Sequence, residues 1–147
     1  MAITQTTTTS FRVELLQAVH NFNTDTFKIA LYTGSADIGP TTTAYTTSGE
    51  TSGTGYVAGG NTLVVSQTPT YGFGPAPNQI PTAYVSFANT SWAGASFTAR
   101  GALIYNASKS NKSVAVLDFG GDKTVTNQTF QVQFPAADAN SAIVRIA

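Results

Sequence analysis

The longest apolar stretches of the chain are residues 95–106 and 113–119, and a short polar segment, ASKSNK at residues 107–112, separates them. Apolar side chains occupy both sets of alternate positions in each stretch, as expected of strands that are covered on both faces. The segment between them contains turn-forming and charged residues. The pattern therefore predicts a central hairpin, and the rest of the chain must supply a layer on top of it.

Shorter alternating patterns predict further strands around this hairpin. In residues 27–32, Phe27, Ile29 and Leu31 face one way and Lys28, Ala30 and Tyr32 face the other, which is typical of a half-buried strand. We expect other strands in residues 61–67, 83–87, 130–134 and 143–146.

A single helix is expected, over residues 10–22, with Ser10 as its N-cap and Glu14 in its first turn. Its apolar residues recur at helical spacings and form one stripe: Phe11, Leu15, Ala18, Val19 and Phe22. The elements together predict an all-β fold, an antiparallel β-sandwich or jelly roll with one short N-terminal helix. Residues 10–147 are expected to form a single domain, preceded by an N-terminal arm, residues 1–9.

Three segments are candidates for contacts with partners. The arm is either a flexible terminus or a strand that adds to a neighbour's sheet. It ends in four threonines, Thr6, Thr7, Thr8 and Thr9. Residues 33–55 and 68–81 are long loops rich in Gly, Pro, Thr and Ser, and such loops are often functional. Their aromatic residues Tyr45, Tyr71 and Phe73 are the expected contact side chains, the last two at the tip of the second loop.

The composition narrows the classes of function. Charged residues make up only 10% of the 147 residues and the formal net charge is zero, which argues against a nucleic-acid binder. No stretch approaches the length of a membrane span, so we expect no membrane insertion. The N-terminus lacks a basic region followed by an apolar run, and we therefore expect synthesis in a cytoplasm. A surface with so few charges is tolerable when partners cover much of it, which favours a subunit of an assembly.

The inventory of reactive side chains is small. There is no cysteine, and the single histidine, His20, is expected to be structural rather than a ligand or base. Asp118 and Asp122 flank Gly120 and Gly121, where a turn with Asp-to-backbone hydrogen bonds is favoured over a weak cation loop. Trp92 is expected in the core, with sugar stacking as the alternative. No catalytic, cofactor-binding or metal-binding residue is predicted.

Four blocks of sequence cover most of residues 27–147: FKIALYTGSADI, TSGETSGTGYVAGG, SWAGASFTARGALIYNASKSNKSVAVLDFGGDK and FPAADANSAIVRIA. In content and order they resemble a group of small virion structural proteins of tailed bacteriophages. Within that group, size and charge are most similar to those of capsid decoration (cement) proteins. The resemblance implies a non-enzymatic subunit, present in many copies and oligomeric, on the outer surface of the capsid, where it binds the major capsid protein and stabilises the head.

The main alternative is a subunit associated with the tail or a fibre, in contact with a tail protein and carrying loops that bind glycan. An enzyme is the third class, and the small inventory of reactive groups disfavours it. Copy number per virion would separate the first two classes, because a decoration protein is needed in hundreds of copies and a tail protein in few.

Overall fold

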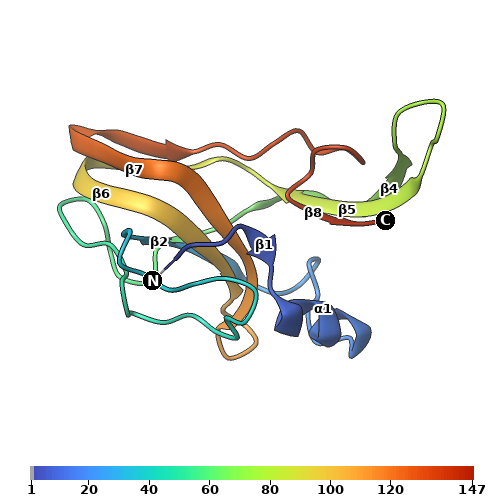
Figure 1. Ribbon diagram of the computed structural model, residues 1–147, viewed down its shortest axis with the longest axis horizontal. Coiled ribbons are helices and arrows are strands. Elements are labelled where there is room, and N and C mark those ends of the chain that lie inside the picture. The colour runs from blue at the N-terminus through green and yellow to red at the C-terminus, as the bar shows by residue number, and fades with distance from the viewer. Residues whose placement is uncertain (1) are drawn as a thin grey trace.

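The computed structural model, described for residues 2–147, is an all-β sandwich with one short helix, as predicted. A five-stranded antiparallel sheet has the order β1-β7-β6-β2-β3, and a three-stranded antiparallel sheet has the order β4-β5-β8 (Figure 1). The strands of the first sheet are β1 (Thr6–Thr7), β2 (Phe27–Tyr32), β3 (Asn61–Thr62), β6 (Thr90–Asn106) and β7 (Lys112–Val132). Those of the second are β4 (Val65–Phe73), β5 (Pro81–Phe87) and β8 (Val144–Ile146), and the helix is α1 (Thr9–Leu16).

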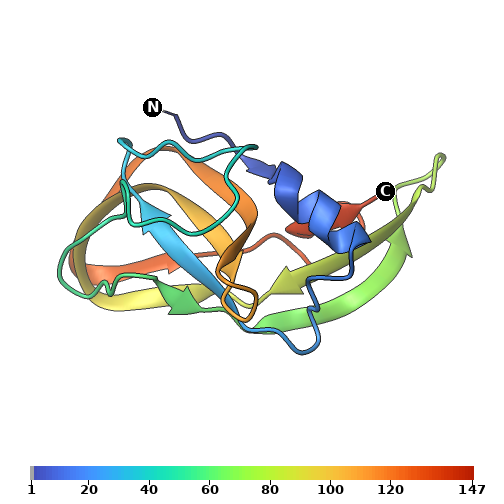
Figure 2. The ribbon, with the colours of Figure 1, turned by 90° about the horizontal axis from the view of Figure 1, so that it is seen from below.

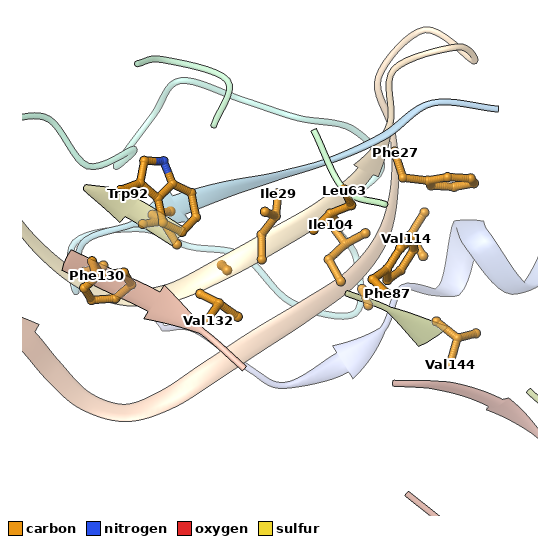
Figure 3. Packing of buried hydrophobic residues seen from close by; sticks show 14 of the residues in the cluster. Phe27, Ile29, Leu63, Phe87, Trp92, Ile104, Val114, Phe130, Val132 and Val144 are labelled. Atoms are coloured by element: carbon orange, nitrogen blue, oxygen red, sulfur yellow. The ribbon is translucent and has the colours of Figure 1, made fainter. Parts of the chain in front are cut away.

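Strands β6 and β7 lie inside the five-stranded sheet, and the part of their hairpin near the turn, residues 101–106 and 113–116, is buried on both faces, which confirms the two-sided apolar pattern there. Residues 120–129 of β7 are exposed or half-buried. On one face, Phe27 and Ile29 of β2 and Ile104 of β6 pack against Val85 and Phe87 of the three-stranded sheet (Figure 3). Trp92 joins this core at 4% exposure, as expected.

The loop between β2 and β3 covers the opposite face of the five-stranded sheet. Ala36 and Ile38 of this loop are buried against Tyr32, Leu103 and Val116. The expected long loop therefore forms a layer of its own on this face, while the three-stranded sheet covers the other face.

A carboxylate at the middle of the loop holds this layer in place. Glu50 accepts hydrogen bonds from the hydroxyls of Tyr45 and Tyr56 and from the backbone N–H of Gly59, each at 2.7 Å. The Tyr105 hydroxyl donates to the carbonyl of Gly59 at 2.7 Å, which connects the loop to β6. Burial raises the pKa of Tyr56 far above its ordinary value, so its hydroxyl keeps the proton that it donates.

The helix is shorter than predicted and begins with a different cap. Thr8 is the N-cap, its hydroxyl accepts a hydrogen bond from the N–H of Phe11, and the last helical residue is Leu16. Ala18 adopts a φ of 57°, in the left-handed region that ends helices. The chain after it turns back, so that Phe22 reaches the core from a loop and stacks on Phe27 with ring centroids 4.6 Å apart.

Three strand boundaries also differ from the prediction. The expected strand over residues 61–67 is divided, because the buried side chain of Leu63 lies where the chain leaves one sheet for the other. The proline-rich segment expected to be a loop belongs to β4 as far as Phe73, and Pro69 is accommodated because β4 is an edge strand with an irregular register at this point. Residues 113–119 and the strand near Phe130 form one long strand, β7, with a bulge opposite Arg100.

Candidate functional site

One face of the three-stranded sheet changes from buried to exposed along its length. Strand pairing places Val85 beside Val144 and Ala83 beside Tyr71 and Ile146, and alternation puts all five residues on the same face. Val85 and Val144 lie in the core at 3% and 4% exposure. Tyr71 and Ile146 are 70% and 56% exposed. The apolar face of this sheet therefore extends beyond the layer that covers it.

The exposed part of this face, which we call the distal face, carries two aromatic rings. Tyr71 and Phe73 are two residues apart on β4, and their rings meet edge to face with centroids 6.0 Å apart. Phe73 is 56% exposed and lies opposite Pro81 on β5. A gathering of large apolar side chains that the described residues 2–147 leave uncovered is typical of a surface that binds something else.

Helix α1 covers only the inner part of the same sheet, near β8 (Figure 2). A cavity of about 350 Å³ lies between them, lined mainly by apolar side chains that include Leu15, Phe22, Val85 and Val144. At the end of the helix, Leu16 is 91% exposed. The helix therefore adds a further uncovered apolar side chain close to the sheet.

The predicted contact residues do not gather in one place. Tyr71 and Phe73 lie on the distal face, in strand β4 rather than at a loop tip, since the loop that follows occupies residues 74–80. Tyr45 is half-buried on the other layer, where its ring stacks on Tyr105 at 4.9 Å. An alanine at position 45 would therefore remove a contact that holds the loop as well as any contact with a partner.

The arm is ordered by its own chain. Thr6 and Thr7 form β1 and pair with Val116 and Ala115 of β7. Thr8 has 0% exposure, and its hydroxyl lies 2.9 Å from that of Ser113, so its prediction as a contact residue is corrected: it lies inside the domain. Thr9 is exposed at the start of the helix.

A buried polar network connects the helix to the central hairpin. The Nε2–H of His20 donates to Glu14 Oε2 at 2.7 Å, and the amide of Asn106 donates to His20 Nδ1 at 3.0 Å and to Asp25 Oδ2 at 2.7 Å. Lys112 Nζ completes the network on Glu14 Oε1 at 2.8 Å. Each donor meets an acceptor, so the network fixes the position of α1 and of the turn that follows it on the hairpin.

The two carboxyl groups of this network titrate below their ordinary range. Burial raises the pKa of Glu14, but the hydrogen bonds from Lys112 and His20 outweigh burial and bring it below 4.5. Burial likewise raises the pKa of Asp25, and the hydrogen bonds from Asn106 and the N–H of Asn21 bring it below 3.8. Both carboxylates therefore stabilise the fold in their charged form.

We expect acid to destabilise the protein through this network. A carboxyl group whose folded-state pKa is depressed stabilises the fold above its unfolded pKa, and that stabilisation is lost as the pH falls through the folded pKa. Glu14→Gln should lower the free energy of unfolding at pH 7 by about 1–3 kcal/mol, because charged hydrogen bonds are lost, and should flatten its decline below about pH 4.5. Urea denaturation at a series of pH values measures both effects.

The exposed Asp37 provides the control for this prediction. Asp37→Asn removes the same charge away from the network and should change the free energy of unfolding by less than about 0.5 kcal/mol. Equal losses for the two variants would show that Glu14 does not act through its hydrogen bonds to His20 and Lys112.

Asp118 behaves as the sequence indicated. Its Oδ1 accepts from the N–H of Gly120 at 2.9 Å, although the segment is a bulge in β7 rather than a turn between strands. Within residues 2–147, no group of three or more His, Asp or Glu side chains is placed to hold a metal ion. No helix in the described part of the chain is long and apolar enough to cross a membrane.

Sequence reasoning missed two members of the exposed apolar surface, Ile146 and Leu16. The alternation of Val144 and Ile146 predicted the strand, but it did not show that Val144 would be buried and Ile146 exposed. Leu16 falls outside the predicted helical stripe, and only this could have distinguished it from a core residue. Comparison with known proteins gives no further identification: no family model, no curated protein and no solved structure matches the chain.

Proposed function

We propose that the protein is a non-enzymatic structural subunit of a bacteriophage virion, a decoration protein that binds the outer surface of the capsid and stabilises the head. The observation that carries the proposal is the distal face, on which Tyr71, Phe73 and Ile146 are more than half exposed. The sequence blocks that resemble small phage virion proteins supply the identity of the assembly.

The rest of the structure is suited to attachment. The part of the central hairpin near its turn is covered on both faces by the chain itself, so the distal face can remain open without weakening this core. Stabilisation of a head would follow from mass action, because a subunit that binds only the assembled shell shifts the equilibrium toward that shell. Repetition of one modest contact by the symmetry of the shell adds avidity.

The alternative is attachment to a tail or fibre, with the two aromatic rings stacking on a sugar. The edge-to-face pair of Tyr71 and Phe73 favours this candidate, because an exposed aromatic ring can bind the apolar face of a pyranose. The two candidates differ in where the protein is found and in what competes with it.

We predict that Tyr71→Ala and Phe73→Ala each weaken attachment to heads by about 1–3 kcal/mol if the ring lies at the centre of the contact. Heads stripped of the protein would be incubated with each variant, and bound protein would be measured after sedimentation. Val57→Ala is the matched control, since Val57 is 76% exposed on the loop that covers the other sheet. Equal occupancy for all three variants would remove the distal face from the contact.

The functional test follows genome release on heating. Heads without the protein should assemble and should release DNA at a lower temperature than heads to which it has been added back. Release at the same temperature, or localisation of the protein to tails alone, would overturn the head assignment. Displacement by a soluble glycan would then support the alternative.

A further inference from the structure

One edge strand of each sheet borders a common gap. β1 is the last strand of the five-stranded sheet and β8 is the last strand of the three-stranded sheet. Thr7 of β1 lines two depressions that Arg145 of β8 also lines, one on the helix side and one on the opposite side. Open edges have free backbone N–H and C=O groups, and an extended chain can pair with them.

The two depressions differ in chemistry. The depression on the helix side, about 260 Å³, is lined by apolar side chains of α1 and β8: Phe11, Leu15, Leu16, Val144 and Ile146. The depression on the other side, about 370 Å³, is lined by smaller or more polar residues that include Thr82, Ala139 and Ala142. A strand in the gap would direct alternate side chains into the two depressions, so its sequence would have to alternate between apolar and polar residues.

The charged side chains that line the two depressions are of one sign. Arg12 lines the helix-side depression, Arg145 lines both, and no carboxylate side chain lines either. In the described part of the chain, the ion pairs of the acidic residues are made with His20, Arg100, Lys109 and Lys112, and none is made with Arg12 or Arg145. Both arginines are exposed, and among the described residues each guanidinium donates one hydrogen bond, that of Arg12 to Thr9 and that of Arg145 to the carbonyl of Asn140.

We propose that an extended segment of a partner protein adds as a strand to β8 in this gap, with apolar side chains facing α1 and carboxylates between them facing Arg145 on the opposite side. The proposal rests on the proposed function in that the partner would be the virion protein to which this subunit attaches. The partner segment would be acidic, with apolar and acidic residues in alternation. It would make a second contact between this subunit and the virion, in addition to the distal face. A guanidinium pairs with a carboxylate through two hydrogen bonds, which favours carboxylates over neutral polar residues at these positions.

The test uses two labelled peptides of the same length, one alternating Val with Glu and the other alternating Val with Lys, each blocked at both ends. Fluorescence anisotropy with the intact protein should show binding of the Glu peptide, weakened by added salt, and no binding of the Lys peptide. Arg145→Glu should weaken binding about fivefold, which is the upper range for an exposed ion pair, and Arg12→Glu, on the side of the apolar residues, should weaken it less. Lys123→Glu, the same reversal at an exposed position of β7, should leave it unchanged.

Amide chemical shifts locate the site. With the Glu peptide they should change at Thr7 and at Val144–Ile146 and should be unaffected at Phe73. Absence of binding, equal binding of both peptides, or shifts confined to Tyr71 and Phe73 would overturn the proposal.

Stripped heads separate this proposal from the function on which it rests. If wild-type protein and the Arg145→Glu variant bind heads equally, strand addition is wrong and the decoration function stands. If the Glu peptide binds as expected but wild-type protein does not bind heads, the strand site stands and the decoration function is wrong.

Discussion

Replacement of Gly60 by alanine should destabilise the protein by more than about 3 kcal/mol, because strain and overlap occur together at this position. Gly60 adopts a φ of 70°, and a Cβ added there would overlap the carbonyl oxygen of Ile29 and crowd the Cα of Ala30. These are backbone atoms of β2, which lies between β6 and β3 in the five-stranded sheet, so they cannot move aside as a flexible side chain would. The end of the covering loop and the start of β3 would have to shift instead.

A substitution at Gly94 separates the cost of the backbone conformation from the cost of steric overlap. Its φ of 58° is equally unfavourable for alanine, but a Cβ there would meet nothing within 4 Å. Gly94→Ala should therefore show the cost of the backbone conformation alone, about 1–2 kcal/mol. Guanidinium denaturation of both variants measures the difference, and similar midpoints would mean that β2 yields to the added methyl group.

The part of the fold that depends on local periodicity could be predicted from the sequence. Apolar residues at both sets of alternate positions in residues 95–106 predicted a strand covered on two sides, and both faces of β6 are covered. What covers the second face could not be predicted, because Ala36, Ile38 and Tyr45 lie at irregular spacings in a loop. Ile38 is held by backbone hydrogen bonds with Ala2 and Thr4, and Tyr45 by Glu50, whose three hydrogen-bond donors come together only in the folded chain.

The predicted bounds of the helix and of β4 were wrong because contacts between distant residues override the local pattern. The spacing of Phe11, Leu15 and Phe22 fits a helix that continues to residue 22, six residues beyond the observed end at Leu16. His20, however, is held by Glu14 and Asn106, and the chain turns at Ala18 to reach them. Pro69 disfavours a central strand, and its position at a sheet edge could not be known before the sheet order.

Some residues of the candidate site could be predicted from the sequence and others could not. Tyr71 and Phe73 could be selected from the sequence as aromatic residues in a segment rich in glycine and proline. Their neighbour Ile146 and the pair Arg12 and Arg145 could not, because the two ends of the chain meet only when β8 lies beside α1.

Phe27→Ala is expected to have the other largest effect, a loss of about 3–5 kcal/mol in the free energy of unfolding, as for other large aromatic residues truncated in a core. Phe27 is 1% exposed on β2, its ring stacks on Phe22, and it lies 5.8 Å from the ring of Phe87 on β5. Phe22 in turn contacts the ring of Phe11 on the helix at 6.1 Å. One side chain thus joins both sheets and, through Phe22, the helix, and its removal would leave a cavity where they meet.

Phe73→Ala is the matched control, since it removes the same ring from a position that is 56% exposed. It should change the free energy of unfolding by less than about 0.5 kcal/mol while it weakens attachment to heads. Phe27→Ala should show the opposite pattern below its unfolding temperature, with stability lost and attachment by the remaining folded molecules retained. Calorimetry and head binding on the same two proteins measure both properties. If Phe73→Ala lowered stability as much as Phe27→Ala, the distal face would be part of the core that holds the fold rather than a surface left open for a partner.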